Sequence, residues 1–283
     1  PGPPRAPFAA RPAVYGGRRH PGKGGERGRG PSRGGGVLRR ARMRDVAALL
    51  LLVLLAATAP ARALAPVKVG VAGATGRLGS RIVQQLTTTL PPGSTVVALC
   101  SPDGASRVTP HPMVSPTPVD MADEAALAEA MAGCAAAVCA LGARESEPLN
   151  WRAPYEVDGL MSQRVVAAAE RAGVKDFVLV TSLGTGRFGL PASLLNLFWG
   201  VLSWKRRTEE LLEKSSMNSL IVRPGGMERP TDDYEQTHNM ALFGADAKSG
   251  GLISRLQVAK LVAAAVASPD VGVTNSIVEC IAD

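Results

Sequence analysis

From residue 67 to its end, the chain alternates between short apolar runs and amphipathic stretches. Continuous apolar and β-branched runs predict strands at 67–72, 94–100, 135–141, 177–182, 220–223 and 276–281. Apolar residues at helical spacing predict helices at 76–90, 123–131, 161–172 and 255–267. Strands that are apolar throughout and alternate with helices are covered on both faces. The pattern therefore predicts an α/β fold, a doubly wound parallel sheet with helices on both faces and ligands bound at the carboxyl ends of the strands.

The first 42 residues do not share this pattern. They are rich in Gly, Pro and Arg and poor in aliphatic side chains, so they cannot bury enough apolar surface to fold. Three interpretations of residues 1–42 stay open: a disordered segment, a transit-like segment, or a stretch upstream of Met43 that is not translated.

Residues 43–63 are similar to a signal peptide. Arg44 precedes an apolar run at 46–59, and Ala61-Arg62-Ala63 matches a cleavage motif. The run is too short for a comfortable transmembrane span. A secretory signal is one interpretation, and a bipartite plastid signal with twin arginines at 39–40 is the other. Either way, the mature domain is predicted at 64–283.

The charge of the chain is divided between these parts. The whole sequence has 32 Lys plus Arg and 24 Asp plus Glu, a net charge of +8. Residues 1–44 hold 12 of the basic residues and one acid, which leaves 20 basic and 23 acidic residues from Asp45 onward. The folded part is therefore slightly acidic, and its charge excludes the class of proteins that bind nucleic acids through a basic surface.

The cysteines and histidines do not predict a metal site. Cys100, Cys134, Cys139 and Cys280 form no Cys-x-x-Cys pair, and they are expected to be buried free thiols. In the folded part, neither histidine has a Cys or a second His at ligand spacing.

The strongest chemical signal is the turn Gly73-Ala-Thr-Gly-Arg-Leu-Gly79, directly after the first strand and at the start of the first helix. Glycine allows a tight turn, close approach to a pyrophosphate, and close packing of helix on strand. Amides at the helix N-terminus then face the anion. The turn predicts a Rossmann domain that binds a dinucleotide. The residues predicted to contact it are Gly73, Thr75, Gly76, Arg77, Leu78 and Gly79.

The same glycine turn resembles the fingerprint of the atypical extended short-chain dehydrogenases/reductases. Two further strings, at Leu179–Arg207 and Ile221–Asn239, resemble the NAD(P)-binding module of the dehydrogenase-like, redox-sensing subunit of the chloroplast inner-envelope translocon. The resemblance covers residues 67–283. It implies a plastid protein, in the stroma or at a membrane. The secretory pathway is the alternative.

The resemblance implies further site residues. Asp120 matches the adenine contact, and its alternative is a helix N-cap. Leu141 and Gly142 match the wall of the nicotinamide ribose site. Ser182 matches the active-site serine, whose alternative is the capping of a turn. Pro224 and Gly225 match the contact to the nicotinamide carboxamide.

One family element is incomplete. Active members carry Tyr-x-x-x-Lys, in which the Lys holds the nicotinamide ribose and lowers the pKa of the Tyr phenol. Here the frame is Val201-Leu-Ser-Trp-Lys205. Lys205 is predicted to bind cofactor and to act with Ser182 if there is catalysis, and its alternative is a solvated lysine in a basic cluster. The tyrosine is absent, so cofactor binding is expected and enzymatic turnover stays open.

The choice between NADP(H) and NAD(H) depends on the end of the second strand. A basic residue there meets the 2′-phosphate of NADP, but this chain has Cys100-Ser-Pro-Asp103. Arg77, and Arg81 one turn later, could reach the phosphate from the first helix. We expect NADP(H) in preference to NAD(H).

One apolar segment is the basis for predicting partners other than the dinucleotide. Phe188–Trp204 contains no charged residue, and we expect it to contact a membrane surface or a partner protein, with complete burial as the alternative. In plant relatives, a Pro/Ser-rich tail binds ferredoxin–NADP reductase. The sequence ends at Asp283, directly after the last predicted strand, so this partner is not expected.

Three functions follow from these features. The first is a redox-responsive binding or docking module with weak or no turnover. The second is an active NAD(P)H-dependent reductase of a flavin, quinone or pigment-like substrate. The third is an assembly factor with a vestigial pocket.

Overall fold

The computed structural model describes residues 65–143, 152–186, 200–227, 232–268 and 273–283. The segments predicted at 1–42 and 43–63 lie outside the described residues, and so does most of Phe188–Trp204.

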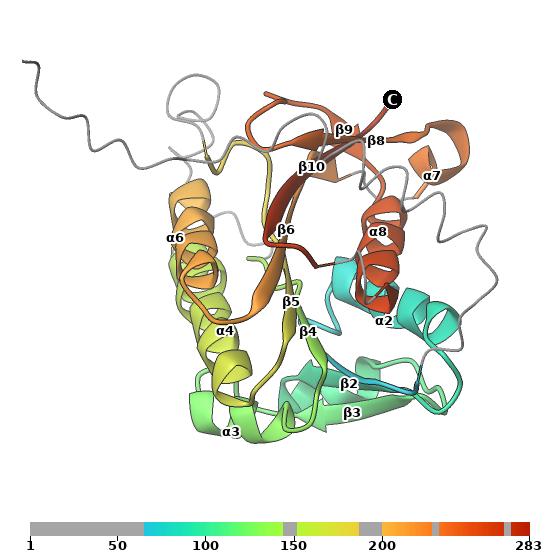
Figure 1. Cartoon of the computed structure of the whole chain (residues 1–283), viewed down its shortest axis with the longest axis vertical. Coiled ribbons are helices and arrows are strands. Elements are labelled where there is room, and N and C mark those ends of the chain that lie inside the picture. Colours follow the sequence, from blue (N-terminus) through green and yellow to red (C-terminus); the bar gives the residue numbers. More distant parts are fainter. Residues whose placement is uncertain (1–64, 144–151, 187–199, 228–231, 269–272) are drawn as a thin grey trace, which may run out of the picture. The chain divides into compact units, whose positions relative to one another are not determined.

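An eight-stranded sheet forms the centre of the fold (Figure 1). Its order is β3-β2-β1-β4-β5-β6-β10-β8. All neighbouring pairs are parallel except β8 and β10, which are antiparallel. The strands are β1 (Lys68–Ala72), β2 (Thr95–Cys100), β3 (Val114–Pro118), β4 (Ala136–Cys139), β5 (Asp176–Val180), β6 (Asn218–Pro224), β8 (Met240–Gly244) and β10 (Ser276–Ala282). A separate two-stranded sheet pairs β7 (Gly226–Met227) with β9 (Leu252–Ile253).

Helices cover both faces of the sheet (Figure 1). On one face α2 (Arg77–Thr89) packs against α8 (Arg255–Ala267). On the other face α4 (Ser162–Arg171) lies between α3 (Glu124–Ala130) and α6 (Val201–Glu213). Three short helices complete the described part: η1 (Pro102–Arg107), η2 (Pro154–Met161) and α7 (Tyr234–Thr237).

The sequence pattern explains this two-sided core. Alternate residues of a strand point to opposite faces of the sheet. On β5, Val178 and Val180 pack with the α2 and α8 side, whereas Phe177 and Leu179 pack with the α3, α4 and α6 side. Each such buried side chain stabilises the fold by about 1.5–3 kcal/mol relative to exposure. All four cysteines are free and buried, as predicted, and burial raises the pKa of the Cys280 thiol to about 12.

The predicted doubly wound fold is confirmed, and the structure also contains elements outside the predicted ranges, among them β3, β7, β9, η1 and α7. Other differences concern the predicted elements and their connections. The edge strand β8 is antiparallel. The helix predicted to begin at residue 161 is preceded by η2, a π-helical segment that starts at Pro154. The interval between the strands predicted at 177–182 and 220–223 contains α6.

Candidate dinucleotide site

The glycine turn between β1 and α2 is shaped by backbone contacts that exclude side chains. Gly73 has a φ of +82°, and a Cβ there would lie 2.9 Å from the carbonyl oxygen of Ala140 at the end of β4. A Cβ on Gly79 would lie 2.0 Å from the carbonyl oxygen of Gly73. Gly76 is the N-cap of α2 and brings no side-chain oxygen to the first turn. The turn therefore presents a helix N-terminus whose cap leaves room for an anion.

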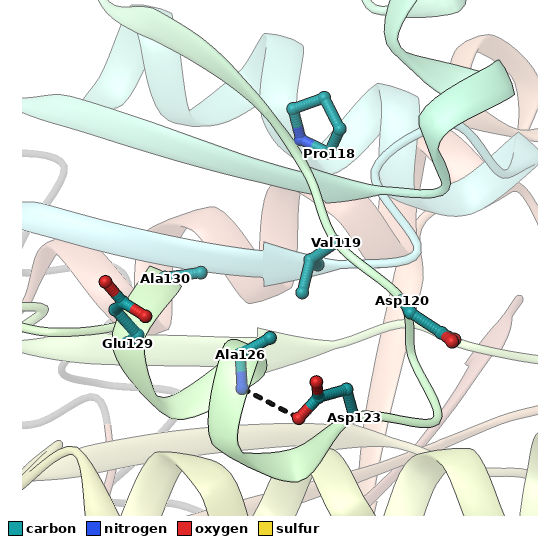
Figure 2. Close-up of a pocket in the computed structure, with 7 residues that line it drawn as sticks. All are labelled: Pro118, Val119, Asp120, Asp123, Ala126, Glu129 and Ala130. Atoms are coloured by element: carbon teal, nitrogen blue, oxygen red, sulfur yellow. Dashed lines mark hydrogen bonds between the residues drawn. The ribbon is translucent and has the colours of Figure 1, made fainter.

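Strands β1, β2 and β3 are parallel neighbours, so their carboxyl ends lie next to one another. Ala72 pairs with Leu99, Cys100 pairs with Pro118, and the N–H of Val119 donates to the carbonyl oxygen of Cys100 at 2.8 Å. A shallow hollow lies beyond β3, and Figure 2 shows the residues that line it: Pro118, Val119, Asp120, Asp123, Ala126, Glu129 and Ala130. One end of the hollow, at Pro118, Val119 and Asp120, adjoins the carboxyl end of β3, the edge of the sheet at which ligands bind in this fold.

Asp120 does not cap the helix that follows. Its Oδ1 accepts a hydrogen bond of 2.8 Å from the N–H of Ala122, an Asx turn. The N-cap of α3 is Asp123, whose Oδ1 accepts from the N–H of Ala126 at 3.0 Å (Figure 2). The alternative of Asp120 as N-cap is therefore wrong, and its contact with adenine stays a prediction.

Lys205 is held by a buried acid that the sequence did not point to. Its Nζ lies 2.5 Å from Oδ1 of Asp158, and the two side chains are 14% and 1% exposed. Oδ2 of Asp158 accepts from the N–H of Ala143 at 3.2 Å, in the turn that contains Leu141 and Gly142. The alternative of a solvated Lys205 is therefore wrong. The ion pair joins α6, η2 and the exit from β4, where the ribose contacts are predicted.

No tyrosine precedes Lys205 by one turn of α6. Val201 is the first residue of the helix, after Gly200 at a φ of +67°. The ring of Tyr155, on η2, lies 4.8 Å from that of Trp204. Residues 201 and 205 therefore lie one turn apart on α6, as the sequence spacing predicts. The side chain of Val201 cannot exchange a proton.

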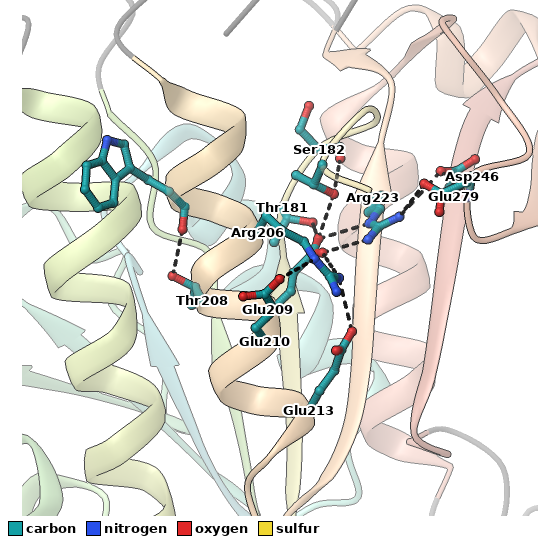
Figure 3. Close-up of polar contacts among 12 residues, drawn as sticks. Thr181, Ser182, Arg206, Thr208, Glu209, Glu210, Glu213, Arg223, Asp246 and Glu279 are labelled. Atoms are coloured by element: carbon teal, nitrogen blue, oxygen red, sulfur yellow. Dashed lines mark hydrogen bonds and ion pairs between the residues drawn. The ribbon is translucent and has the colours of Figure 1, made fainter. Parts of the chain in front are cut away.

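The end of β5 is tied to α6 through Glu209. The hydroxyls of Thr181 and Thr185 donate to Oε1 of Glu209 at 2.7 and 2.9 Å (Figure 3). The carbonyl oxygen of Ser182 accepts from the hydroxyl of Thr185 at 3.2 Å. Ser182 is half-buried at the carboxyl end of β5, and its catalytic role stays a prediction.

Glu209 is also the centre of a buried ion network that the sequence analysis did not identify. Arg223, on β6, donates to Oε1 and Oε2 of Glu209 at 3.0 and 2.7 Å, and both side chains are at most 1% exposed (Figure 3). Its Nη1 reaches Asp246 at 3.0 Å and lies 3.9 Å from Glu279. Burial alone would raise the pKa of Glu209. The hydrogen bonds and the charge of Arg223, together with the hydrogen bonds of Thr181 and Thr185, lower it. An arginine within the apolar run 218–224 was the available signal, since a buried charge needs a partner.

Backbone groups of Pro224 and Gly225, the predicted contact to the carboxamide, already form hydrogen bonds within the fold. The N–H of Gly225 donates to the carbonyl oxygen of Cys280 at 2.9 Å, and that of Leu183 to the carbonyl oxygen of Pro224 at 3.0 Å. A Cβ on Gly225 would lie 2.5 Å from the carbonyl oxygen of Gly251. The glycine is thus required by this close approach, and the contact with nicotinamide stays a prediction.

Arg81 is held by groups of the protein itself, and its Nη1 donates to the carbonyl oxygen of Arg77 at 2.7 Å. Its guanidinium pairs with Asp232 at 2.6 Å, and Asp232 also accepts from the hydroxyl of Ser254. Arg77 is exposed in the first turn of α2, which makes it the more suitable of the two for a phosphate.

Comparison with known proteins identifies the family. The model of a family described as NAD(P)H-binding matches residues 73–269, from the glycine turn through α8. The chain belongs to the NAD(P)H-binding family. Its cofactor class is therefore a nicotinamide dinucleotide, as predicted.

Two curated proteins are similar to this chain over most of its length. Protein TIC 62, chloroplastic, from Arabidopsis thaliana is 41% identical over 230 residues, which are 75% of this chain and 35% of that protein. The protein of the same name from Pisum sativum is 42% identical over 229 residues, 75% of this chain and 42% of that protein. The chain thus spans well under half the length of these relatives. The predicted resemblance is confirmed.

A solved structure shows the same fold. The oxidoreductase ylbE from Lactococcus lactis has a TM-score of 0.62 and 19% identity, over 76% of this chain and 91% of that one. The NAD(P)H-binding domain therefore has a Rossmann-like fold.

Proposed function

We propose that this protein binds NADP(H) and responds to the redox state of the nicotinamide as a docking module in a plastid, with weak or no turnover of its own. The observation that carries the proposal is the ion pair between Lys205 and Asp158, one turn after Val201. In an active member the lysine would act on a tyrosine phenol, and here its charge is neutralised by a carboxylate at 2.5 Å. The glycine turn keeps the means to bind a cofactor, whereas the proton donor is missing.

Location and partner rest on different observations. The similar proteins from Arabidopsis thaliana and Pisum sativum are named as chloroplast proteins, which supports a plastid. The apolar composition of the segment Phe188–Trp204 supports it as the docking segment, although residues 188–199 lie outside the described ranges. In the described part, Trp204 is half-buried under Arg207, with the guanidinium carbon 4.5 Å from the ring centre. Among the described residues, no helix has the length and apolar composition needed to cross a membrane.

Calorimetric titration of the full chain with NADPH, NADP⁺ and NADH tests the binding part. The expected result is saturable binding of NADPH and NADP⁺, and the two oxidation states should differ in their effect on flotation with plastid-lipid vesicles. Absence of binding at millimolar ligand would contradict the proposal and favour an assembly factor with a vestigial pocket.

A second function, an active reductase, is favoured by Ser182. Its hydroxyl lies at the carboxyl end of β5, where bound substrate is expected, and could supply a proton in place of the tyrosine. Oxidation of NADPH by a panel of quinones, flavins and linear tetrapyrroles distinguishes the two functions. Turnover above about 1 s⁻¹, the low end of ordinary enzymes, that is lost in Ser182→Ala would establish the reductase.

A further inference from the structure

The short helix η1 turns the chain back over the carboxyl end of β2. A Cβ added to Gly104 would lie 3.1 Å from Oγ of Ser101, 3.4 Å from Nη2 of Arg107, and 3.4 Å from Cβ of Cys100. The hydroxyl and the guanidinium thus converge above the last residue of the strand. Gly104 is buried between them, and the lack of a side chain there lets the guanidinium approach.

The guanidinium of Arg107 is available to a ligand. Both Ser101 and Arg107 are exposed. Within the described ranges, Arg107 makes no ion pair or hydrogen bond, whereas Arg81, Arg206 and Arg223 are each held by carboxylates. Burial raises the pKa of the Cys100 thiol at the end of β2, and the nearby charge of Arg107 acts against that rise.

The position of this pair relative to the glycine turn points to one part of the ligand. Because Ala72 pairs with Leu99, the turn at Gly73 and the exit at Ser101 leave the sheet next to each other. Asp120, which is predicted to contact adenine, follows the next strand, β3. Between pyrophosphate and adenine lies the adenosine ribose, whose 2′ position meets the end of the second strand.

We propose that Arg107, with Ser101, binds the 2′-phosphate of NADP(H) and sets the preference for NADP(H) over NAD(H). The inference rests on the proposed dinucleotide site and names a residue within it. A guanidinium matches a phosphate with two parallel hydrogen bonds, and a serine hydroxyl can donate a third. No basic residue directly follows β2 in the sequence, because Arg107 comes seven positions after Cys100 and is brought back by η1.

The same helix carries a competing charge. Asp103 is exposed in the first turn of η1, and an acid near this place accepts a hydrogen bond from the 2′-hydroxyl of NAD and repels a 2′-phosphate. The two residues therefore make opposite predictions about cofactor preference, and both can be changed without loss of buried contacts.

Titration of the full chain with NADPH and NADH measures the preference directly. In Arg107→Ala the Kd for NADPH should rise about tenfold, the value of one exposed charge-assisted contact, while the Kd for NADH stays within about twofold. Arg107→Lys should recover part of the loss. Asp103→Asn should tighten NADPH binding, because it removes a repelling charge. Arg171→Ala, which removes an exposed arginine from the last turn of α4, is the control and should leave both Kd values unchanged. The pair 2′,5′-ADP and 5′-AMP should repeat the result, which places the contact at the 2′-phosphate.

The possible outcomes separate the two levels of the proposal. If the unmodified chain binds neither dinucleotide, the proposed function fails and the role of Arg107 with it. If it binds NADPH but Arg107→Ala weakens NADPH and NADH equally, or neither, only the assignment of Arg107 is overturned. A preference that reverses in Asp103→Asn and not in Arg107→Ala would assign the selection to the acid. Circular dichroism melting curves of each variant check that the fold is retained.

Discussion

The two halves of the carboxyl edge of the sheet use their polar groups in opposite ways. At β1 to β3, the turn Gly73–Gly79 presents backbone groups with no side-chain cap, and Arg107 is exposed beside it. At β5 to β10, Glu209 and Arg223 are fully buried and bonded to each other. In the first half, polar groups are accessible to a ligand. In the second half, the charged side chains are paired with each other.

This difference separates binding from turnover. A Rossmann domain holds the adenosine and pyrophosphate through one half of the sheet edge, and active enzymes place their proton donors around the nicotinamide in the other half. Here the ion pair of Asp158 and Lys205 lies at the border, and the network around Glu209 lies beyond it. Changes in the second half should therefore affect stability first, and changes in the first half should affect affinity first.

The largest effect is expected from Glu209→Ala. It leaves Arg223 buried, with Asp246 as its nearest remaining acid at 3.0 Å. The hydroxyl of Thr181 loses its acceptor, whereas that of Thr185 keeps its hydrogen bond to the carbonyl oxygen of Ser182. Removal of one partner of a buried ion pair costs about 3–5 kcal/mol. Urea unfolding followed by circular dichroism measures the free energy of unfolding.

Arg206→Ala is the matched control for this experiment. Arg206 bonds the same Glu209 at 3.1 Å from the outer side of α6, but its side chain is 29% exposed. Its loss should cost no more than about 1 kcal/mol, as for surface ion pairs. If both variants lost the same free energy of unfolding, the pair of Glu209 and Arg223 would contribute no more than an exposed ion pair.

The two halves also differ in how far the sequence predicts them. The glycine turn could be identified because its information is local: within seven residues the chain contains strand end, turn and helix start. Helices α2 and α8 were predicted within a residue or so for the same reason, and α8 has a capping box at Ser254 and Gln257. Local pattern is sufficient where neighbours in sequence decide the structure.

The second half depends on residues far apart in the chain. Thr181 and Glu209 are 28 positions apart, and Asp158 and Lys205 are brought together only by the packing of η2 on α6. Neither acid carries a local signal that identifies its partner. Strand β8 was missed because it is an edge strand whose pairing is decided by β10. Tertiary contacts therefore determine these features, and one sequence alone did not reveal them.

The next largest effect is expected from Gly79→Ala, in the half that offers groups to a ligand. The new Cβ would lie 2.0 Å from the carbonyl oxygen of Gly73, so the turn must shift. Such overpacking costs about 1–3 kcal/mol, and the displaced amides should weaken NADPH binding about tenfold or more. Gly250→Ala is the control, because a Cβ there meets no atom within 4 Å. Unchanged NADPH affinity in Gly79→Ala would remove the glycine turn from the site.

A smaller effect is expected from acid. The pKa of Glu209 is lowered in the folded protein, so its stabilisation is complete above the pKa of an unfolded glutamate, about 4.3. It is lost as the pH falls below that value toward the lowered pKa. Between pH 7 and pH 4, the free energy of unfolding should fall more for the unmodified protein than for Glu209→Gln. Glu129→Gln, an exposed control, should follow the unmodified protein.

The smallest effect is expected from Val201→Tyr, which restores the phenol one turn before Lys205. General acid catalysis is worth about 10²–10⁴-fold when the acid is correctly tuned. Here Asp158 lies 2.5 Å from the ammonium and cancels most of its field at the phenol, so NADPH-dependent quinone reduction should rise by less than about tenfold. Val201→Tyr combined with Asp158→Asn should gain more than the single variant. A gain of about 100-fold or more from the tyrosine alone would mean that Lys205 acts as in an active reductase, and that the second half of the sheet edge lacks only its proton donor.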